Sequence, residues 1–259
     1  MSQDQNDTSF LDTFEVFRGD SVSIVGSGGK VTLMYQLAKE AVALNYSVLT
    51  TASTHIHPPN AKQSAGLVVT SEEPDWLTDL PDTLAERGHM TVVGARPRPD
   101  KLRGLTIDAL DELRTECPTD LLLIKSDGAR TKVFKAPAEH EPVVPPWVTH
   151  CIIVAGLQSV GLTLTEENVH RSERVSELSG LKMKAKLTPA AIGTVVSHPE
   201  AYLRRIHEDI NVSVYLGWCS DDERRQMAEE VAEHIDMTRI SAVYCGAIDE
   251  SDATLTLLR

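Results

Sequence analysis

Hydrophobic positions along the chain fall into short runs of strand length, separated by stretches with helical spacing. The short apolar runs lie at residues 21–25, 46–51, 66–70, 90–94, 121–124, 151–155, 211–217 and 240–246. Helical spacing of apolar residues covers residues 32–44, part of 73–86, and residues 107–113, 173–178, 189–196 and 221–235. Because strands and helices alternate, we predict an α/β fold with a mostly parallel sheet and helices on both faces.

The organisation of the chain changes in its second half. Residues 1–13 are polar and predict an N-terminal tail, and residues 14–259 predict a single α/β domain. A subdomain change is placed near 156–163, after which shorter and more polar helical insertions join the same sheet. Residues 96–103 predict a basic, proline-containing loop, and residues 129–147 a long loop with four prolines, of a kind that is often functional.

Composition narrows the classes of function. The chain has 259 residues, of which 41% are hydrophobic and 24% charged, as in ordinary globular proteins. Its net charge of −13 argues against binding to nucleic acid or anionic membranes. No apolar run approaches the roughly 18 residues of a transmembrane helix. The four cysteines are scattered, and with an N-terminus unlike a signal peptide they predict a cytoplasmic protein.

The clearest chemical signal is a glycine loop between the first strand and the first long helix, with the sequence Val-Gly-Ser-Gly-Gly-Lys-Val-Thr at 25–32. Such a turn aims backbone N–H groups and a helix N-terminus at one point, which suits a phosphate. The candidate phosphate-binding residues are Gly26, Ser27, Gly28, Gly29, Lys30 and Thr32. The match to a standard P-loop is imperfect, because Val31 stands where a magnesium-binding hydroxyl is usual. The alternatives are a tight turn with an exposed lysine, or a dinucleotide fingerprint, which fits less well because it lacks the third glycine.

A second signal follows the apolar strand at 121–124, which runs into Lys125-Ser126-Asp127-Gly128. A carboxylate at a strand end beside a phosphate loop suits magnesium, so Asp127 is a candidate metal ligand and catalytic residue, with Thr32 as a second metal ligand. The alternative is an aspartate that begins an ordinary turn.

Weaker signals come from histidines and from basic clusters. Glu139, His140 and Glu141 form an acid–histidine–acid run that suits metal binding or acid/base work, or equally an exposed charged loop. His55 and His57 form an isolated pair of candidate metal ligands. The basic residues are Arg96, Arg98, Lys101 and Arg103, then Arg130, Lys132 and Lys135, and later Lys182, Lys184 and Lys186. Arg130 and Lys135 are the best anion-binding candidates because they follow Asp127, and the pair at 170–171 is a weaker one.

Four segments, in order, resemble the YqeC-type selenium-dependent molybdenum hydroxylase accessory proteins. They are residues 23–37, 48–56, 127–145 and 169–171, and the run Lys-Ala-Pro-Ala-Glu-His-Glu-Pro at 135–142 is the most specific part. The resemblance spans about residues 14–234. It implies a P-loop nucleotide-binding fold, ATP or GTP with Mg²⁺ as ligands, and assistance to the maturation of a molybdenum hydroxylase client. It assigns the phosphate loop to Lys30 and its glycines, a threonine-rich strand end to Thr50, Thr51, Thr54 and His55, and the acidic strand end to Asp127.

The chain departs from the family pattern at three places. Val31 replaces a threonine, Lys125 replaces a glutamate, and residues 216–221 replace an Asn-x-Ala-Asp-like segment that resembles a base-recognition motif. Each departure removes a magnesium ligand, a carboxylate or a base contact, so hydrolysis is affected more than binding. One hypothesis is that the positive charge of Lys125 takes over part of the electrostatic role of the metal.

Three functional hypotheses follow. The first is a nucleotide-binding accessory protein, with weak ATP or GTP hydrolysis left open. Its catalytic residues are Asp127, His140 and Glu141, and His55 and Glu139 also line its site. The second is a non-hydrolysing, degenerate P-loop module that binds an anion, a cofactor fragment or a client protein. The third is a metal-dependent enzyme that uses His55, His57 and His140.

Overall fold

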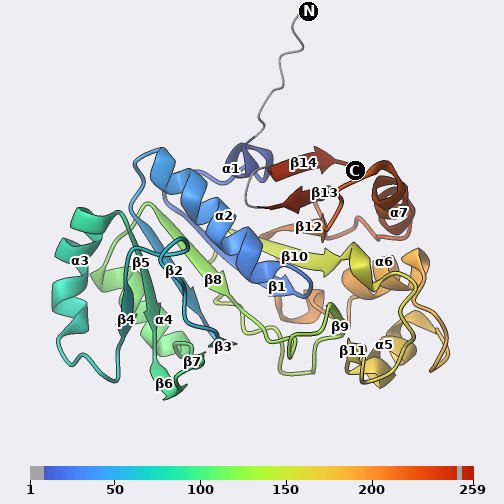
Figure 1. Cartoon of the computed structure of the whole chain (residues 1–259), viewed down its shortest axis with the longest axis horizontal. Helices are drawn as coiled ribbons and strands as arrows, with labels where there is room; N and C mark the ends of the chain where they lie inside the picture. Colours follow the sequence, from blue (N-terminus) through green and yellow to red (C-terminus); the bar gives the residue numbers. More distant parts are fainter. Residues whose placement is uncertain (1–8, 250–252) are drawn as a thin grey trace, which may run out of the picture.

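The computed structural model describes residues 9–249 and 253–259 and is built around one nine-stranded sheet (Figure 1). The sheet strands are β1 (Asp20–Gly26), β2 (Val48–Ala52), β4 (Leu67–Val69), β5 (His89–Val93), β8 (Leu121–Lys125), β10 (His150–Gly156), β12 (Asn211–Gly217), β13 (Ala242–Ile248) and β14 (Ala253–Leu257). Their order is β14-β13-β12-β10-β1-β8-β2-β5-β4, and only the β13–β14 pair is antiparallel. The predicted α/β fold with a mostly parallel sheet is confirmed.

Helices cover both faces of the sheet. They are α1 (Phe10–Thr13), α2 (Lys30–Ala43), α3 (Trp76–Arg87), α4 (Ile107–Glu116), α5 (Ser172–Ser179), α6 (Pro189–Ser197) and α7 (Asp222–Glu233), with short 3₁₀ turns at Leu157–Ser159 and Leu203–Arg205. The apolar sides of α1 and α2 share one core cluster, and those of α3 to α7 share the other. In Figure 1, α2 crosses in front of the central strands.

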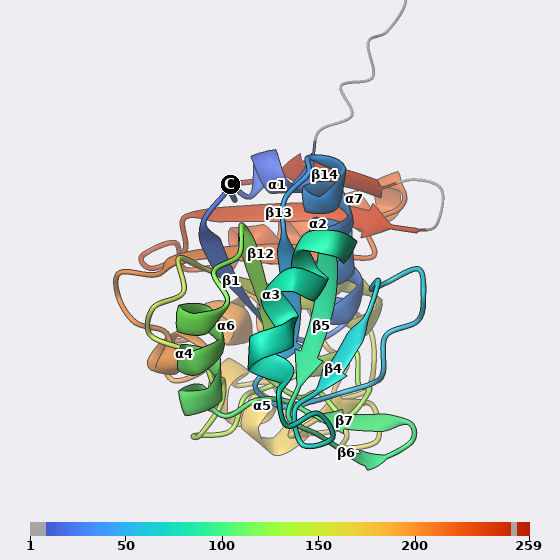
Figure 2. The same ribbon diagram turned by 90° about the vertical axis from the view of Figure 1, so that its left-hand side faces the viewer.

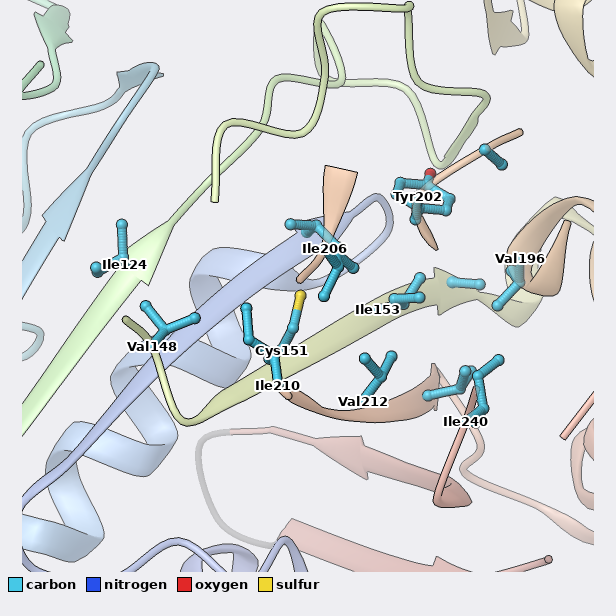
Figure 3. Packing of buried hydrophobic residues seen from close by; sticks show 14 of the residues in the cluster. Ile124, Val148, Cys151, Ile153, Val196, Tyr202, Ile206, Ile210, Val212 and Ile240 are labelled. Atoms are coloured by element: carbon cyan, nitrogen blue, oxygen red, sulfur yellow. The ribbon is translucent and has the colours of Figure 1, made fainter. Parts of the chain in front are cut away.

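The core is formed by alternate residues of these strands, as expected for a sheet that is covered on both sides. Figure 3 shows Cys151 and Ile153 of β10 pointing to the same side as Val212 of β12, in the buried cluster that also holds Ile206. Tyr202 lies in the same cluster, and its hydroxyl donates a hydrogen bond to the Lys135 carbonyl at 3.2 Å. This contact ties the core to the loop that carries the site described below.

Two small sheets lie beyond the main one. Strands β3 (His55–Ile56), β7 (Lys101–Arg103) and β6 (Ala95–Arg98) form an antiparallel sheet, and β9 (Phe134–Lys135) pairs with β11 (Val169–His170). Figure 1 shows β3, β9 and β11 gathered beyond the carboxyl ends of the central strands, and in Figure 2 the β6–β7 hairpin projects below β4 and β5. The segments that follow β2, β8 and β10 therefore converge at one edge, which is where ligands bind in open α/β sheets.

Two predicted features need correction. Residues 10–13 are not part of a loose tail, because they form α1 with Phe10 and Leu11 buried against α2, whereas residues 1–8 lie outside the described chain. Residues 96–103 are largely a β-hairpin rather than a loop. The sheet runs on across 156–163, since β10 and β12 are neighbours. Within the described residues, no helix is long and apolar enough to cross a membrane.

Candidate functional site

A large cavity opens at the carboxyl edge of the sheet, with a volume of about 1020 Å³. It is bordered by the glycine loop after β1, by the loops after β2, β8 and β10, and by the residue after β12. Nine of the predicted site residues line it: Ser27, Gly28, Gly29, Lys30, Thr32, Thr54, His55, Arg130 and Glu141. Residues from distant parts of the chain therefore share one space.

The glycine loop is built so that only glycine fits at two of its positions. Gly26 and Gly28 have φ of +96° and +81°, a region that side chains avoid. A Cβ on Gly26 would lie 2.1 Å from the Val154 carbonyl oxygen, and one on Gly28 would lie 2.7 Å from the Cα of Gly156. The loop thus packs tightly on β10 and delivers the first residues of α2 to the cavity.

The buried hydroxyl of Ser27 is an independent indication of a binding site. Its side chain is 1% exposed and lines the cavity, yet its hydroxyl oxygen has no hydrogen-bond partner among the described residues. A buried hydroxyl without a partner is costly, and a bound acceptor such as a phosphate oxygen would satisfy it.

Beneath the loop lies a chain of buried charges. The Lys30 ammonium contacts both the Asp127 carboxylate and the Gly26 carbonyl oxygen. The Lys135 Nζ lies 2.8 Å from Asp127 Oδ2 and 2.8 Å from Glu141 Oε2, and the Arg171 guanidinium also lies 2.8 Å from Glu141 Oε2. Asp127 further accepts the Gly26 N–H at 2.9 Å. These contacting side chains therefore alternate between cation and anion, from Lys30 at the glycine loop to Arg171 after β11.

The pKa values in this chain of charges follow from burial and pairing. Burial opposes the charged form of Asp127, but the Lys30 and Lys135 ammonium groups outweigh it and hold its pKa below the usual range. For Glu141, burial is likewise outweighed by Lys135 and Arg171, and its pKa is lowered. Burial lowers the pKa of Lys30, against the opposing effect of Asp127. Both carboxylates are therefore ionised at neutral pH.

Lys125 is a second buried cation, and it has no carboxylate partner among the described residues. Its Nζ donates to the Asp127 carbonyl at 2.6 Å, the His55 carbonyl at 2.8 Å and the Thr54 hydroxyl at 3.1 Å. Burial, followed by the nearby charge of Lys30, lowers the pKa of Lys125 to about 7. The side chain lines the cavity, so an anion bound there would meet a positive charge that the protein itself leaves unneutralised.

The cavity as a whole is basic although the chain is acidic. The lysines and arginines that line it are Lys30, Arg98, Lys101, Lys125, Arg130, Lys132 and Arg171, and the acidic residue that lines it is Glu141. The chain as a whole carries 38 acids against 25 Lys and Arg. A concentration of positive charge in one concavity of an acidic protein is what an anion-binding site requires.

One aromatic side chain stands at the rim of the cavity. Trp218 follows β12, is 54% exposed, and has an unusual φ of +68°. Arg130, Thr131 and Arg171 are further non-glycine residues with positive φ that line the same cavity. Such backbone conformations cost free energy and cluster at functional sites. Four of the seven non-glycine residues with positive φ in the described part of the chain therefore lie around this cavity.

Several predicted site residues lie elsewhere. Thr51 is fully buried in β2, with its hydroxyl donating to the Val92 carbonyl at 2.6 Å, so it does not reach the cavity. His140 is exposed and is not among the lining residues, although Glu141 beside it is. Asp127 and Lys135 lie behind the cavity wall and act on it through Lys30 and Glu141.

The residues present do not form a magnesium site. Both oxygens of Asp127 already meet cations, and Val31 lines the cavity at the position where a hydroxyl would be needed. Thr32, the substitute considered from the sequence, lies one residue further along α2 and lines the cavity without a carboxylate partner there. Across residues 9–249 and 253–259, no three His, Cys, Asp or Glu side chains are grouped to hold a metal ion, so His55, His57 and His140 do not form the predicted metal centre.

The sequence did not single out Trp218, Gln158 or Arg98 as site residues, although all three line the cavity. Arg98 belonged to a basic cluster that reads as solvated surface, and Gln158 carries no signal of its own. Trp218 stands in the segment where the family shows a base-recognition motif, and that position is the signal that could have indicated it.

The chain is similar in sequence to one curated protein and aligns with solved structures of another. The chain is 29% identical over 234 residues to a protein of Escherichia coli strain K12 described as uncharacterized protein YqeC. The aligned region covers 90% of this chain and 89% of that protein. Two solved structures of FtsY align with most of this chain at low similarity. FtsY from Mycoplasma mycoides has a TM-score of 0.37 at 14% identity, with 87% of this chain and 60% of that chain covered. The signal recognition particle receptor FtsY from Elizabethkingia anophelis has a TM-score of 0.40 at 12% identity, covering 92% of this chain and 62% of that chain.

The chain thus spans about three fifths of the length of those FtsY chains. A family model described as YqeC protein matches residues 22–173, which include the glycine loop, Asp127, the buried charges and Arg171. This match covers more than half of the sequence, and the chain therefore belongs to the YqeC family.

Proposed function

We propose that this protein binds a nucleotide, ATP or GTP, with its phosphates on the glycine loop. The observation that carries the proposal is a phosphate-type loop, with the unsatisfied hydroxyl of Ser27, opening into a cavity lined by seven lysines and arginines in a chain of net charge −13. Backbone N–H groups at the start of α2 and the charge of Lys30 hold the phosphates.

Strand order supports one direction for the nucleotide. Trp218 follows β12, two strands from β1 on one side, and Thr54 follows β2, two strands from β1 on the other. In the proposed orientation the base stacks on the exposed indole of Trp218, because aromatic faces hold bases regardless of their sequence identity. The terminal phosphate then points to Lys125 and His55, where the unneutralised positive charge is concentrated.

Binding without hydrolysis is the better-supported form of this function. Hydrolysis by P-loop proteins relies on a magnesium ion and on a group that positions water. Here the carboxylate of Asp127 is held by two lysines, and Val31 brings no hydroxyl. The second candidate, a degenerate module that holds an anion or cofactor fragment, is favoured by the same two features.

The finer proposal is that the nucleotide-bound protein assists the maturation of a selenium-dependent molybdenum hydroxylase, its client, in the cytoplasm. The family resemblance alone supports the client, and the four free cysteines support a reducing compartment.

Calorimetric titration of ATP and of GTP into the purified chain tests the proposal. We expect saturable binding of at least one nucleotide, and its loss in Lys30→Met. Lys39→Met is the matched control, because Lys39 lies on the same helix and is exposed away from the cavity. The proposal fails if neither nucleotide binds, or if Lys30→Met binds as well as Lys39→Met does.

A further inference from the structure

The wall of the cavity opposite Trp218 carries positive charge that is separate from the glycine loop. This wall is formed by β3 and the β6–β7 hairpin, and it contributes His55, His57, Arg98 and Lys101 to the cavity lining. The wall lies away from the glycine loop because of the strand order. Strand β3 follows β2, and β2 lies two strands from β1 in the sheet.

The register of this small sheet sets like charges against one another. Arg98 lies directly across the hairpin from Lys101. Like charges in directly opposite positions destabilise a pair of strands. A short hairpin therefore has no structural reason to present Arg98 and Lys101 together on the wall of a cavity.

The protein does not neutralise this wall from within. Asp100 forms one ion pair with Arg98 at 3.4 Å, and both side chains are largely in water, where such a pair contributes little. Lys101 and Arg103 make no ion pair with an acid of the described residues. Burial, with Lys101, Lys125, Arg103 and Arg98 all acting in the same direction, lowers the pKa of His55. The wall thus presents the cations Arg98 and Lys101 with only one exposed acid beside them among the described residues.

The size of the cavity leaves room for a second ligand. Its volume of about 1020 Å³ is at the upper end of the roughly 300–1,000 Å³ of pockets that enclose a drug-sized molecule. We propose that the wall of His55, Arg98 and Lys101 is a second anion subsite, which holds a small molecule bearing a phosphate or carboxylate next to the terminal phosphate of the nucleotide. The position of the nucleotide rests on the proposed function, whereas the anion subsite itself does not.

The test uses inorganic phosphate as the probe and the imidazole resonance of His55 as the readout. The resonance is assigned by its disappearance in His55→Gln. Phosphate is titrated into the full chain saturated with a non-hydrolysable analogue of whichever nucleotide binds, so that the glycine loop is already filled. Phosphate is also titrated into Lys30→Met. In this variant the response of His55 reports on the wall alone, whether or not a nucleotide binds.

We expect a saturable shift of the His55 resonance in both samples. Arg98→Gln combined with Lys101→Gln is expected to weaken phosphate binding at least about fivefold, because two ion pairs are removed. Arg96→Gln is the control, since Arg96 lies on the same hairpin but pairs with Glu72 outside the cavity. The subsite is refuted if His55 does not respond, if the nucleotide analogue abolishes the response, or if the double variant responds like Arg96→Gln. Failure of the nucleotide proposal is separate, because it shows as absent calorimetric binding while the response of His55 in Lys30→Met persists.

Discussion

The ammonium of Lys135 lies 2.8 Å from the carboxylate of Asp127, and neither side chain exposes any surface to solvent. Lys30 contacts the other carboxylate oxygen. The acid that follows β8 is therefore neutralised by two lysines of its own chain, Lys135 from β9 and Lys30 from α2. This arrangement separates the site from one in which an exposed carboxylate waits for a metal ion.

Removal of the Asp127 charge is expected to destabilise the fold strongly. Asp127→Asn leaves Lys30 buried without its acid and costs Lys135 one of its two carboxylates. We expect a loss of about 3 kcal/mol in the free energy of unfolding, as for other buried ion pairs broken from one side. Urea denaturation measures it, with Asp100→Asn as a control for an exposed pair, expected to change stability by less than about 0.5 kcal/mol. Equal effects of the two variants would contradict the account of the buried charges.

The charge of Lys125 predicts a pH dependence of binding. With a pKa of about 7, the ammonium loses its proton as the pH rises above neutrality, and an anion loses a partner. Nucleotide affinity is therefore expected to fall about tenfold between pH 7 and 8.5. Lys125→Arg keeps its charge throughout this range and should show a flat profile. Calorimetry at several pH values checks this, and parallel profiles for the two proteins would remove Lys125 from the site.

We predict that Trp218 contacts the bound nucleotide and that its backbone strain is the cost of this position. Trp218→Gly suits the positive φ, so the free energy of unfolding should change by no more than about 1 kcal/mol. Nucleotide affinity should fall about tenfold, because stacking on the base is lost. Intrinsic fluorescence gives a second readout: nucleotide should quench the wild type and Trp147→Phe, but not Trp218→Gly. Quenching that survives in Trp218→Gly would show that the base lies elsewhere.

Sequence patterns sufficed for the long elements and for the loop that begins the site. Apolar runs identified all of the central parallel strands, and glycines beside Lys30 marked the phosphate loop, because both signals are local. The β6–β7 hairpin escaped prediction, since strands of three and four residues with prolines show no readable period. The four residues of α1 are equally short, and only their burial against α2 shows that they are ordered.

The buried charges of the site could not be predicted, because they depend on contacts between distant residues that no local sequence pattern encodes. Lys135 was predicted to bind an anion from its position after Asp127, but in the structure it serves Asp127 and Glu141 and lies behind the cavity wall. Arg171 reaches Glu141 because β9 pairs with β11. This pairing covers only two residues on each strand, and the paired residues lie 35 positions apart in the chain. Thr51 was misplaced because alternate residues of a strand face opposite sides, and its hydroxyl points to Val92.

The most direct test of the account is the affinity for ATP and GTP, measured by calorimetry with magnesium and again with a chelator. Because lysines already neutralise Asp127 and Lys125 supplies a positive charge, we expect the dissociation constant to change less than about threefold on removing magnesium. Loss of binding in the chelator, with recovery on adding magnesium, would contradict the central claim and return Asp127 to the role of a metal ligand.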